Sequence, residues 1–186
     1  MKEKPTIRSG VMFTIVTKRL ELKPMNRAFM ASTHSYAKDK EANSYMLHLP
    51  SDSIKETEDF LINCEQNWQQ YSEQEFELDF AILYQGEHVG GLNLTKIADE
   101  DFAEIGWIVN RAFWRQGIAF EAAKAAMQHF SENFHVNHFI ARCDSQNQAS
   151  YALMEKLGMK RLSVSAGRLN KQATKSSLEC LYAIVL

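Results

Sequence analysis

Apolar and polar positions follow a two-residue period along much of this chain, the pattern of strands that bury one face. Such alternation, or a short continuous apolar run, predicts strands over residues 13–22, 78–84, 88–95, 102–109, 138–143, 160–166 and 177–186. Gln85-Gly86-Glu87 stands between the second and third of these segments and predicts a hairpin turn. The last segment is nearly all apolar, so we expect that strand to be buried.

Other segments place apolar residues three and four positions apart, which is the spacing of one helix face. They predict helices over residues 26–37, 53–71, 118–133 and 147–157. Ser51 or Ser53 can cap the second helix, because Glu56 follows Ser53 at capping-box spacing, and Gly158 is a suitable residue to end the last one. Strands predominate and helices are inserted between them, so we predict a mixed α/β fold.

Composition indicates an ordinary globular protein. Of the 186 residues, 45% are apolar and 24% are charged, and the formal net charge is −2. No block rich in Lys or Arg occurs, which argues against a nucleic-acid partner bound through a basic surface. We expect a single domain over residues 11–186 and a flexible polar tail over residues 1–10.

Cysteine usage and hydropathy bear on the compartment. Cys64, Cys143 and Cys180 are odd in number and far apart, which favours a reducing compartment over a disulfide framework. No apolar run approaches the ~20 residues of a membrane span, and the first ten residues lack a signal-peptide hydrophobic region. We therefore expect a soluble cytoplasmic protein without a membrane partner, while a homodimer stays open.

The segment from residue 104 to residue 130 is the most informative part of the chain. A short apolar strand is followed by a loop with Arg111, Arg115 and Gly117, and then by an alanine-rich helix. No Ser, Thr, Asp or Asn stands in the capping place of that helix, and no carboxylate occurs between Glu104 and Glu121. Open backbone N–H groups beside a glycine and arginines predict a phosphate site. The alternative is a strand–helix junction that binds nothing.

Two motifs carry a resemblance to a known family. Trp114-Arg115-Gln116-Gly117-Ile118-Ala119 resembles the acyl-CoA pyrophosphate loop of the GCN5-related N-acetyltransferases, and Glu121-Ala122 resembles their ribosomal-protein-alanine acetyltransferase branch. Downstream, residues 144–159 resemble the family's Asn-x-x-Ser…Glu-Lys-Leu-Gly box, with Met159 for the common Phe. The resemblance implies a central, mixed sheet of six or seven strands, flanked by helices and splayed between the strands that end near Val109 and begin near His138.

The same resemblance implies acetyl-CoA as cosubstrate and assigns its contacts. Those at the loop and helix start are Arg115, Gln116, Gly117, Ile118, Ala119 and Phe120. A backbone N–H near Ile108 or Val109 would bind the thioester carbonyl, and Asn147 would contact the pantetheine or a bound water. Alternatively, Asn147 and Ser150 only cap the helix that they begin. No metal and no covalent intermediate are required.

Acetyl transfer to an amine needs a base and an acid, because the attacking amine must be neutral and the leaving thiolate must be protonated. By resemblance Glu104 is the base, directly or through water, although it is alternatively a solvated edge residue. Many family members place a tyrosine acid directly before Glu-Lys-Leu-Gly, but Met154 stands there and cannot donate a proton. The ribosomal-protein branch uses the Ser of its Asn-x-x-Ser motif as the acid, and Ser150 matches that position. By this resemblance Ser150 is the candidate acid.

The acceptor is the least determined part of this reading. Residues 52–79 contain nine carboxylates and one base, Lys55, and an acidic wall there would attract a cationic acceptor, unless it is an ordinary solvated helix face. The branch resemblance implies a protein N-terminal amine, on a ribosomal protein, and a small polyamine-like amine is the alternative. Met154 also leaves open a non-catalytic acyl-CoA-binding domain. A nucleotide-binding loop lacks the Walker lysine.

Overall fold

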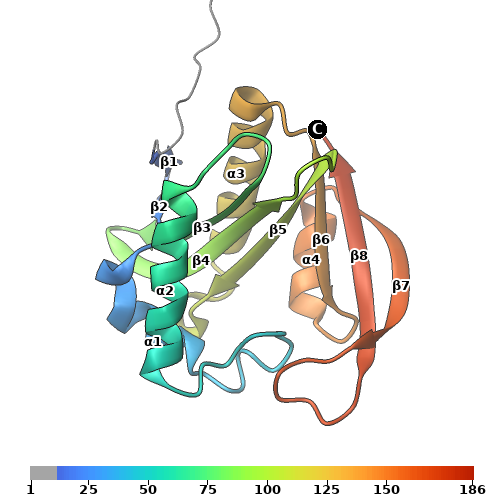
Figure 1. Cartoon of the computed structure of the whole chain (residues 1–186). Coiled ribbons are helices and arrows are strands. Elements are labelled where there is room, and N and C mark those ends of the chain that lie inside the picture. Colours follow the sequence, from blue (N-terminus) through green and yellow to red (C-terminus); the bar gives the residue numbers. More distant parts are fainter. Residues whose placement is uncertain (1–11) are drawn as a thin grey trace, which may run out of the picture.

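A computed structural model describes residues 12–186, so the tail predicted over residues 1–10 lies outside the described residues. One mixed sheet of eight strands runs through the fold (Figure 1). In spatial order the strands are β1 (Ile15–Val16), β2 (Leu20–Pro24), β3 (Phe76–Tyr84), β4 (Glu87–Lys96), β5 (Phe102–Val109), β6 (His138–Asp144), β8 (Ser177–Val185) and β7 (Lys160–Arg168). The mixed α/β class predicted from the sequence is confirmed, but the sheet has eight strands instead of the six or seven that were expected, in part because the first predicted strand is two strands.

Helices cover both faces of the sheet (Figure 1). On one face lie α1 (Met30–Ala37) and α2 (Ile54–Gln69), and on the other lie α3 (Ile118–Phe134) and α4 (Gln148–Lys156). Two short 3-10 helices, η1 (Arg27–Phe29) and η2 (Arg111–Phe113), precede α1 and the loop to α3. The Ser53 side chain accepts from the Glu56 N–H, so the predicted cap of α2 is confirmed.

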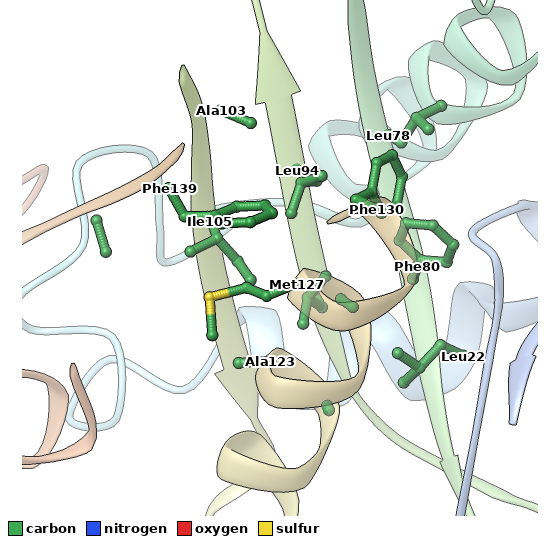
Figure 2. Close-up of a cluster of buried hydrophobic side chains, with 14 of the residues drawn as sticks. Leu22, Leu78, Phe80, Leu94, Ala103, Ile105, Ala123, Met127, Phe130 and Phe139 are labelled. Carbon is green, nitrogen blue, oxygen red and sulfur yellow. The ribbon is translucent and has the colours of Figure 1, made fainter. Parts of the chain in front are cut away.

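The main core lies between α3 and the sheet. Helix α3 turns one continuous apolar face inward, and its buried residues are Ile118, Ala122, Ala123, Ala126, Met127, Phe130 and Phe134. In Figure 2, Met127 and Phe130 of this helix point onto strand residues that include Leu94 and Ile105. Small alanines let the helix axis approach the strands, while the larger side chains fill the space at each end. This packing fixes where α3 begins relative to β5.

Strands β5 and β6 pair over a short length only. They run parallel, and the register covers three residue pairs, from Phe102–His138 to Glu104–Ile140. Beyond Glu104 the two strands diverge, as their ribbons show (Figure 1). The splay that was expected between Val109 and His138 is therefore confirmed.

The two halves of the sheet are joined again at the end where they diverge. The β7–β8 loop (residues 169–176) contacts the α1–α2 loop (residues 38–53). The Lys171 N–H donates to the Met46 carbonyl at 2.9 Å, and Lys171 Nζ donates to the Pro50 carbonyl at 2.9 Å. Gln172 adds a hydrogen bond to the Lys40 carbonyl. These hydrogen bonds, one from a backbone N–H and two from side chains, connect the two halves of the sheet.

The structure departs from the sequence prediction at both ends of the chain. The first predicted strand is two strands, because residues 17–19 form a turn that folds β1 back onto β2. The last strand is not fully buried: Cys180 and Tyr182 are, but Leu178 and Val185 near its ends are 47% and 71% exposed. An antiparallel strand needs only one covered face, so its apolar run overstates its burial. No helix within residues 12–186 is long and apolar enough to cross a membrane.

Gly90 in β4 sets the position of the end of β5. A Cβ at Gly90 would lie 2.2 Å from the Ile108 carbonyl oxygen and 2.9 Å from the Val109 Cα. Real Cβ atoms do not approach backbone this closely, so any side chain here must push the two strands apart. Gly106 in β5 is different, since a Cβ there would meet nothing within 4 Å.

Gly90→Ala is expected to destabilise the fold by about 2 kcal/mol or more, because the added methyl group forces a backbone shift in packed structure. Gly106→Ala, the matched control, should be neutral or slightly stabilising because a strand glycine carries an entropic cost. Urea unfolding of both variants measures the difference. Equal stabilities would mean that β4 and β5 can separate at no cost.

Candidate active site

The N-terminus of α3 has the features of an anion-binding site. Gly117 precedes the helix with φ +76°, and no side chain of the described residues caps it. Arg115 has φ +62°, so the exposed turn is tightly folded and brings its backbone close to the helix start. Helix geometry leaves the first N–H groups without intrahelical acceptors, and these belong to Ile118, Ala119 and Phe120. Together with the helix dipole, they suit a phosphate group.

Arg19 lies against this turn, a contact that the sequence analysis missed. Its Nη1 donates to the Gln116 carbonyl at 3.1 Å, and its Nε pairs with Glu121 Oε2 at 2.7 Å. Thr17 donates a hydrogen bond to the other oxygen of Glu121 at 2.6 Å. Arg19 of the β1–β2 turn thus neutralises Glu121, and its guanidinium group lies beside Gly117. A separation of 102 residues between Arg19 and Glu121 leaves no local sequence signal for the pair.

Arg111 does not serve the anion site that its position suggests. Its two terminal nitrogens pair with Glu41 at 2.6 Å and Asp39 at 2.7 Å, both in the α1–α2 loop. The expectation that Arg111 and Arg115 together flank the phosphate is therefore corrected. Two carboxylates hold Arg111, so it ties η2 to the α1–α2 loop instead.

The end of β5 is fixed by hydrogen bonds from the loop that follows it. The Trp114 indole donates to the Val109 carbonyl at 2.7 Å, and the Asn110 N–H donates to the Val89 carbonyl at 2.8 Å. Ile108 and Val109 are half-buried at this point. Their backbone groups are consequently held in one arrangement next to the turn that leads into α3.

Glu104 lies where the pairing of β5 and β6 ends, on the face of the sheet that α3 does not cover. Its carboxylate forms an ion pair with Arg142 of β6. Arg142 also approaches Glu179 of β8, at 3.7 Å, and Glu179 pairs with Arg168 of β7 at 2.7 Å. Charges of alternating sign therefore cross from β5 to β7. A proton-accepting role for Glu104 requires that it share its carboxylate with Arg142.

Helix α4 places Ser150 on the opposite face of the sheet, beside the end of β6. The Asn147 side-chain oxygen accepts from the Ser150 N–H at 3.2 Å, so Asn147 caps α4 as one alternative held. The Ser150 hydroxyl neighbours the Cys143 thiol; burial raises the pKa of Cys143 to about 11, so this thiol is protonated at neutral pH and a poor nucleophile. Met154 is fully buried in the main core and makes no polar contribution.

A cavity of about 140 Å³ lies between α3 and α4. Its lining is Phe120, Lys124, Met127, Gln128, Lys156, Leu157 and Leu186. The Lys156 ammonium lies 4.5 Å from the centroid of the Phe120 ring, a cation–π contact. Because the Phe120 side chain packs here, its contribution at the helix start is its backbone N–H. The two lysines extend the positive potential from the turn along α3.

The carboxylates of residues 52–79 do not form one wall. Lys171 and Arg27 hold three of them in ion pairs, and these are Asp52, Glu56 and Glu65. Glu77 and Asp79 belong to β3, and their side chains line a separate cavity between the sheet and α2. The carboxylates of α2 therefore form an ordinary solvated helix face, as the alternative held. The two carboxylates of β3 do not. In the described part of the chain, no group of three His, Cys, Asp or Glu side chains is arranged to hold a metal ion.

This geometry places an open helix N-terminus at one edge of a splayed sheet, and comparison with known proteins gives it a family. The sequence matches the acetyltransferase (GNAT) domain over residues 19–160, well over half of the chain. The chain belongs to the GNAT acetyltransferase family. The match contains both segments on which the resemblance was drawn.

Other GNAT proteins resemble this chain over most of its length. The uncharacterized N-acetyltransferase YnaD of Bacillus subtilis (strain 168) is 28% identical over 149 residues, which are 79% of this chain and 82% of YnaD. A GNAT acetyltransferase of Bacillus anthracis aligns with a TM-score of 0.78 at 25% identity, covering 93% and 98% of the two chains. RimL, a ribosomal-protein α-N-acetyltransferase solved with coenzyme A, shares the fold with a TM-score of 0.78 at 23% identity, covering 94% and 98%.

The clamp on Glu121 makes the stability of this GNAT domain depend on pH. Partial burial acts to raise the pKa of Glu121, but hydrogen bonds from Thr17 and Arg19 outweigh it and hold the pKa below its usual range. A carboxyl group with a depressed folded-state pKa stabilises the fold above its unfolded-state pKa, and this contribution is lost as pH falls through the folded-state value. Stability at neutral pH therefore includes the ionised clamp.

Glu121→Gln is expected to cost about 1 kcal/mol of unfolding free energy at pH 7, the range of a partly exposed ion pair. The cost should begin to shrink as pH falls to about 4, the ordinary pKa of a glutamate, and disappear only below the depressed folded-state pKa, where the folded wild-type carboxyl is protonated as well. Urea unfolding of wild type and variant from pH 7 to pH 3 measures it. Glu132→Gln, on the exposed side of the same helix, is the control and should show little pH-dependent difference. A cost that is the same at every pH would remove the charge from the explanation.

Proposed function

We propose that this GNAT protein is an acetyl-CoA-dependent N-acetyltransferase whose acceptor is the N-terminal amine of a protein or peptide. The observation that carries the proposal is the divergence of β5 and β6 beyond Glu104, in a GNAT domain whose helix α3 has an open N-terminus. Glu104 lies on one face of the sheet at this point, and Ser150 lies on the other face beside the end of β6. We assign this activity to residues 11–186 acting as one domain.

The turn before α3 suits the pyrophosphate of acetyl-CoA. Gly117 has no side chain to block approach to the backbone, and open N–H groups follow it. Arg115 supplies positive charge there, Arg19 offsets the charge of Glu121, and Lys124 and Lys156 add positive charge between α3 and α4. Asn147 would reach the pantetheine through its Nδ2 group, because its side-chain oxygen already caps α4.

The proposed transfer is direct. The neutral amine attacks the thioester carbonyl, whose oxygen accepts the backbone N–H of Ile108 or Val109. Glu104 takes the amine proton, directly or through a water molecule, and Ser150 donates a proton to the departing thiolate of coenzyme A. Exchange with solvent then returns a proton to Ser150 and removes the proton from Glu104. Base and acid lie on opposite faces of the sheet, so the acceptor approaches from the α2 side and the thiol leaves on the α4 side. No metal and no covalent intermediate are required.

An N-terminal acceptor is favoured by pKa and by fold. An α-amino group has a pKa near 8, so at neutral pH a larger fraction of it is neutral than of a lysine, whose pKa is near 10.4. RimL, which shares the fold, is a ribosomal-protein α-N-acetyltransferase. A small polyamine-like amine is the second candidate, because Glu77 and Asp79 line a cavity on the acceptor side. A non-catalytic acyl-CoA-binding domain would bind the thioester without releasing thiol.

Gly117→Glu is expected to weaken acetyl-CoA binding by about 100-fold or more, because a carboxylate at this turn would repel the phosphates. Calorimetric titration of acetyl-CoA into wild type and variant measures this. Gly117→Ala has the same backbone strain at positive φ and a small side chain without the charge, so it serves as the control and should lose much less affinity than Gly117→Glu. If the wild type does not bind acetyl-CoA, the pyrophosphate assignment is wrong.

Ser150→Ala is expected to lower kcat by about 100-fold with little change in KM, because general-acid catalysis contributes in that range. Thiol release with acetyl-CoA and peptides that carry different N-terminal residues is the measurement. Ser163→Ala, on the exposed strand β7, is the control. An unchanged kcat would mean that water, not Ser150, protonates the thiolate.

A further inference from the structure

A second cavity lies on the acceptor side of the sheet, under α2. Its volume is about 230 Å³, and it is lined by Phe60, Asn63, Cys64, Asn67, Glu77 and Asp79. Most of this lining is polar, although the rest of the α2–sheet contact is apolar and includes Leu61 and Ala81. A polar cavity inside an apolar contact is costly unless polar or charged groups can be satisfied there.

Asp79 is the buried charge of this cavity. Its Oδ1 accepts a hydrogen bond from the Asn93 amide at 3.1 Å. Burial raises the pKa of Asp79 to about 6, and the neighbouring Glu77 acts in the same direction. Among the residues that the structure describes, no cation contributes to this pKa. A buried carboxylate beside a second acid therefore lacks the positive partner that such groups normally have.

The cavity adjoins β4, because Asp79 in its lining accepts a hydrogen bond from Asn93 of that strand. Glu65, on one flank of α2, is occupied by Arg27 of η1. Phe60 and Asn67 recur at helical spacing on the other flank. The opening is therefore on the side of α2 that faces away from η1.

Sheet register connects the cavity with Glu104. Asp79 of β3 pairs with Asn93 of β4, which pairs with Gly106 of β5. Two residues away on each strand, and therefore on the same face, Glu77 pairs with Thr95, which pairs with Glu104. Side chains in line across three strands share a face and are separated by two strand spacings, about 10 Å in all. A ligand whose amine lies at Glu104 would therefore place a group about 10 Å away at the mouth of the cavity.

We propose that the cavity of Asp79 and Glu77 binds a second protonated amine of the acceptor, about 10 Å from the amine that is acetylated. This rests on the proposed function, because it takes Glu104 as the place of the reacting amine. The ionised Asp79 forms the ion pair, Glu77 adds charge at the rim, and the amides of Asn63 and Asn67 accept remaining N–H groups through their oxygens. The ammonium supplies the cation that the protein itself does not.

One chemistry, an ammonium group, has two sources. It belongs either to a lysine side chain close to the N-terminus of a peptide acceptor or to the far end of a free polyamine. Acetylation of Ala-Lys peptides against Ala-norleucine peptides probes the first source. Spermidine and α,ω-diaminoalkanes of increasing length, against alkylamines of equal length, probe the second. The source of the ammonium group is the acceptor class in which the dicationic acceptor has a lower KM than its matched monocationic acceptor.

Asp79→Asn keeps the size and the hydrogen-bonding capacity of the side chain but removes its charge. It is expected to raise KM for dicationic acceptors about 10-fold, while kcat and KM for monocationic acceptors stay the same. Glu77→Gln, at the exposed rim, should raise the same KM about 3-fold and cannot disturb the core. Glu65→Gln, on the other flank of α2, is the control and should leave the preference intact.

A direct binding measurement separates this proposal from the proposed function. Spermidine is titrated calorimetrically into wild type and Asp79→Asn without acetyl-CoA. Binding to the wild type that the variant loses supports the cavity even if no acceptor is ever acetylated. A wild type that acetylates mono- and dicationic acceptors equally, or an Asp79→Asn variant that raises KM equally for both kinds, overturns the proposal.

Discussion

Hydrogen bonding between β5 and β6 for only three residue pairs is the constraint on which the candidate site depends. Had the pairing continued, the sheet would separate the two helix layers completely. Because it stops at Glu104, the part of β5 that follows, including Ile108 and Val109, is not paired with β6. The packing of α3 then sets where its open N-terminus lies relative to that backbone. The position of the candidate site therefore depends on the strand pairing and the helix packing more than on any single side-chain contact.

Local features of the sequence predicted the fold well. Periodicity located all of the longer strands and helices, because burial of one face imposes a two-residue or a 3.6-residue repeat wherever the element lies. Gly117 without a capping side chain was also visible locally, and the structure has it in the left-handed conformation. The exceptions were the first strand, which is two strands, and the burial of the last strand. Apolar content there indicates a strand but does not say which of its faces a helix covers.

Partners that are distant in sequence could not be predicted. Arg111 and Arg115 lie in the same loop and cannot be distinguished from the sequence. In the structure, Arg111 forms ion pairs with Asp39 and Glu41 of the α1–α2 loop. Arg19 reaches the turn from the far end of the chain, and the ion pair between Glu104 and Arg142 depends on strand register. Charges at a surface choose partners by three-dimensional proximity, which composition and spacing do not encode.

The contact between the α1–α2 loop and the β7–β8 loop has an evolutionary consequence. The GNAT domain match ends at residue 160, so the β7–β8 loop lies beyond it, while the α1–α2 loop lies within it. Lys171 binds backbone carbonyls of the α1–α2 loop, and its ammonium also pairs with Asp52 and Glu56. Insertions or changes of length in one loop displace acceptors that the other requires. The two loops must therefore be inherited, or exchanged in a chimera, as one unit.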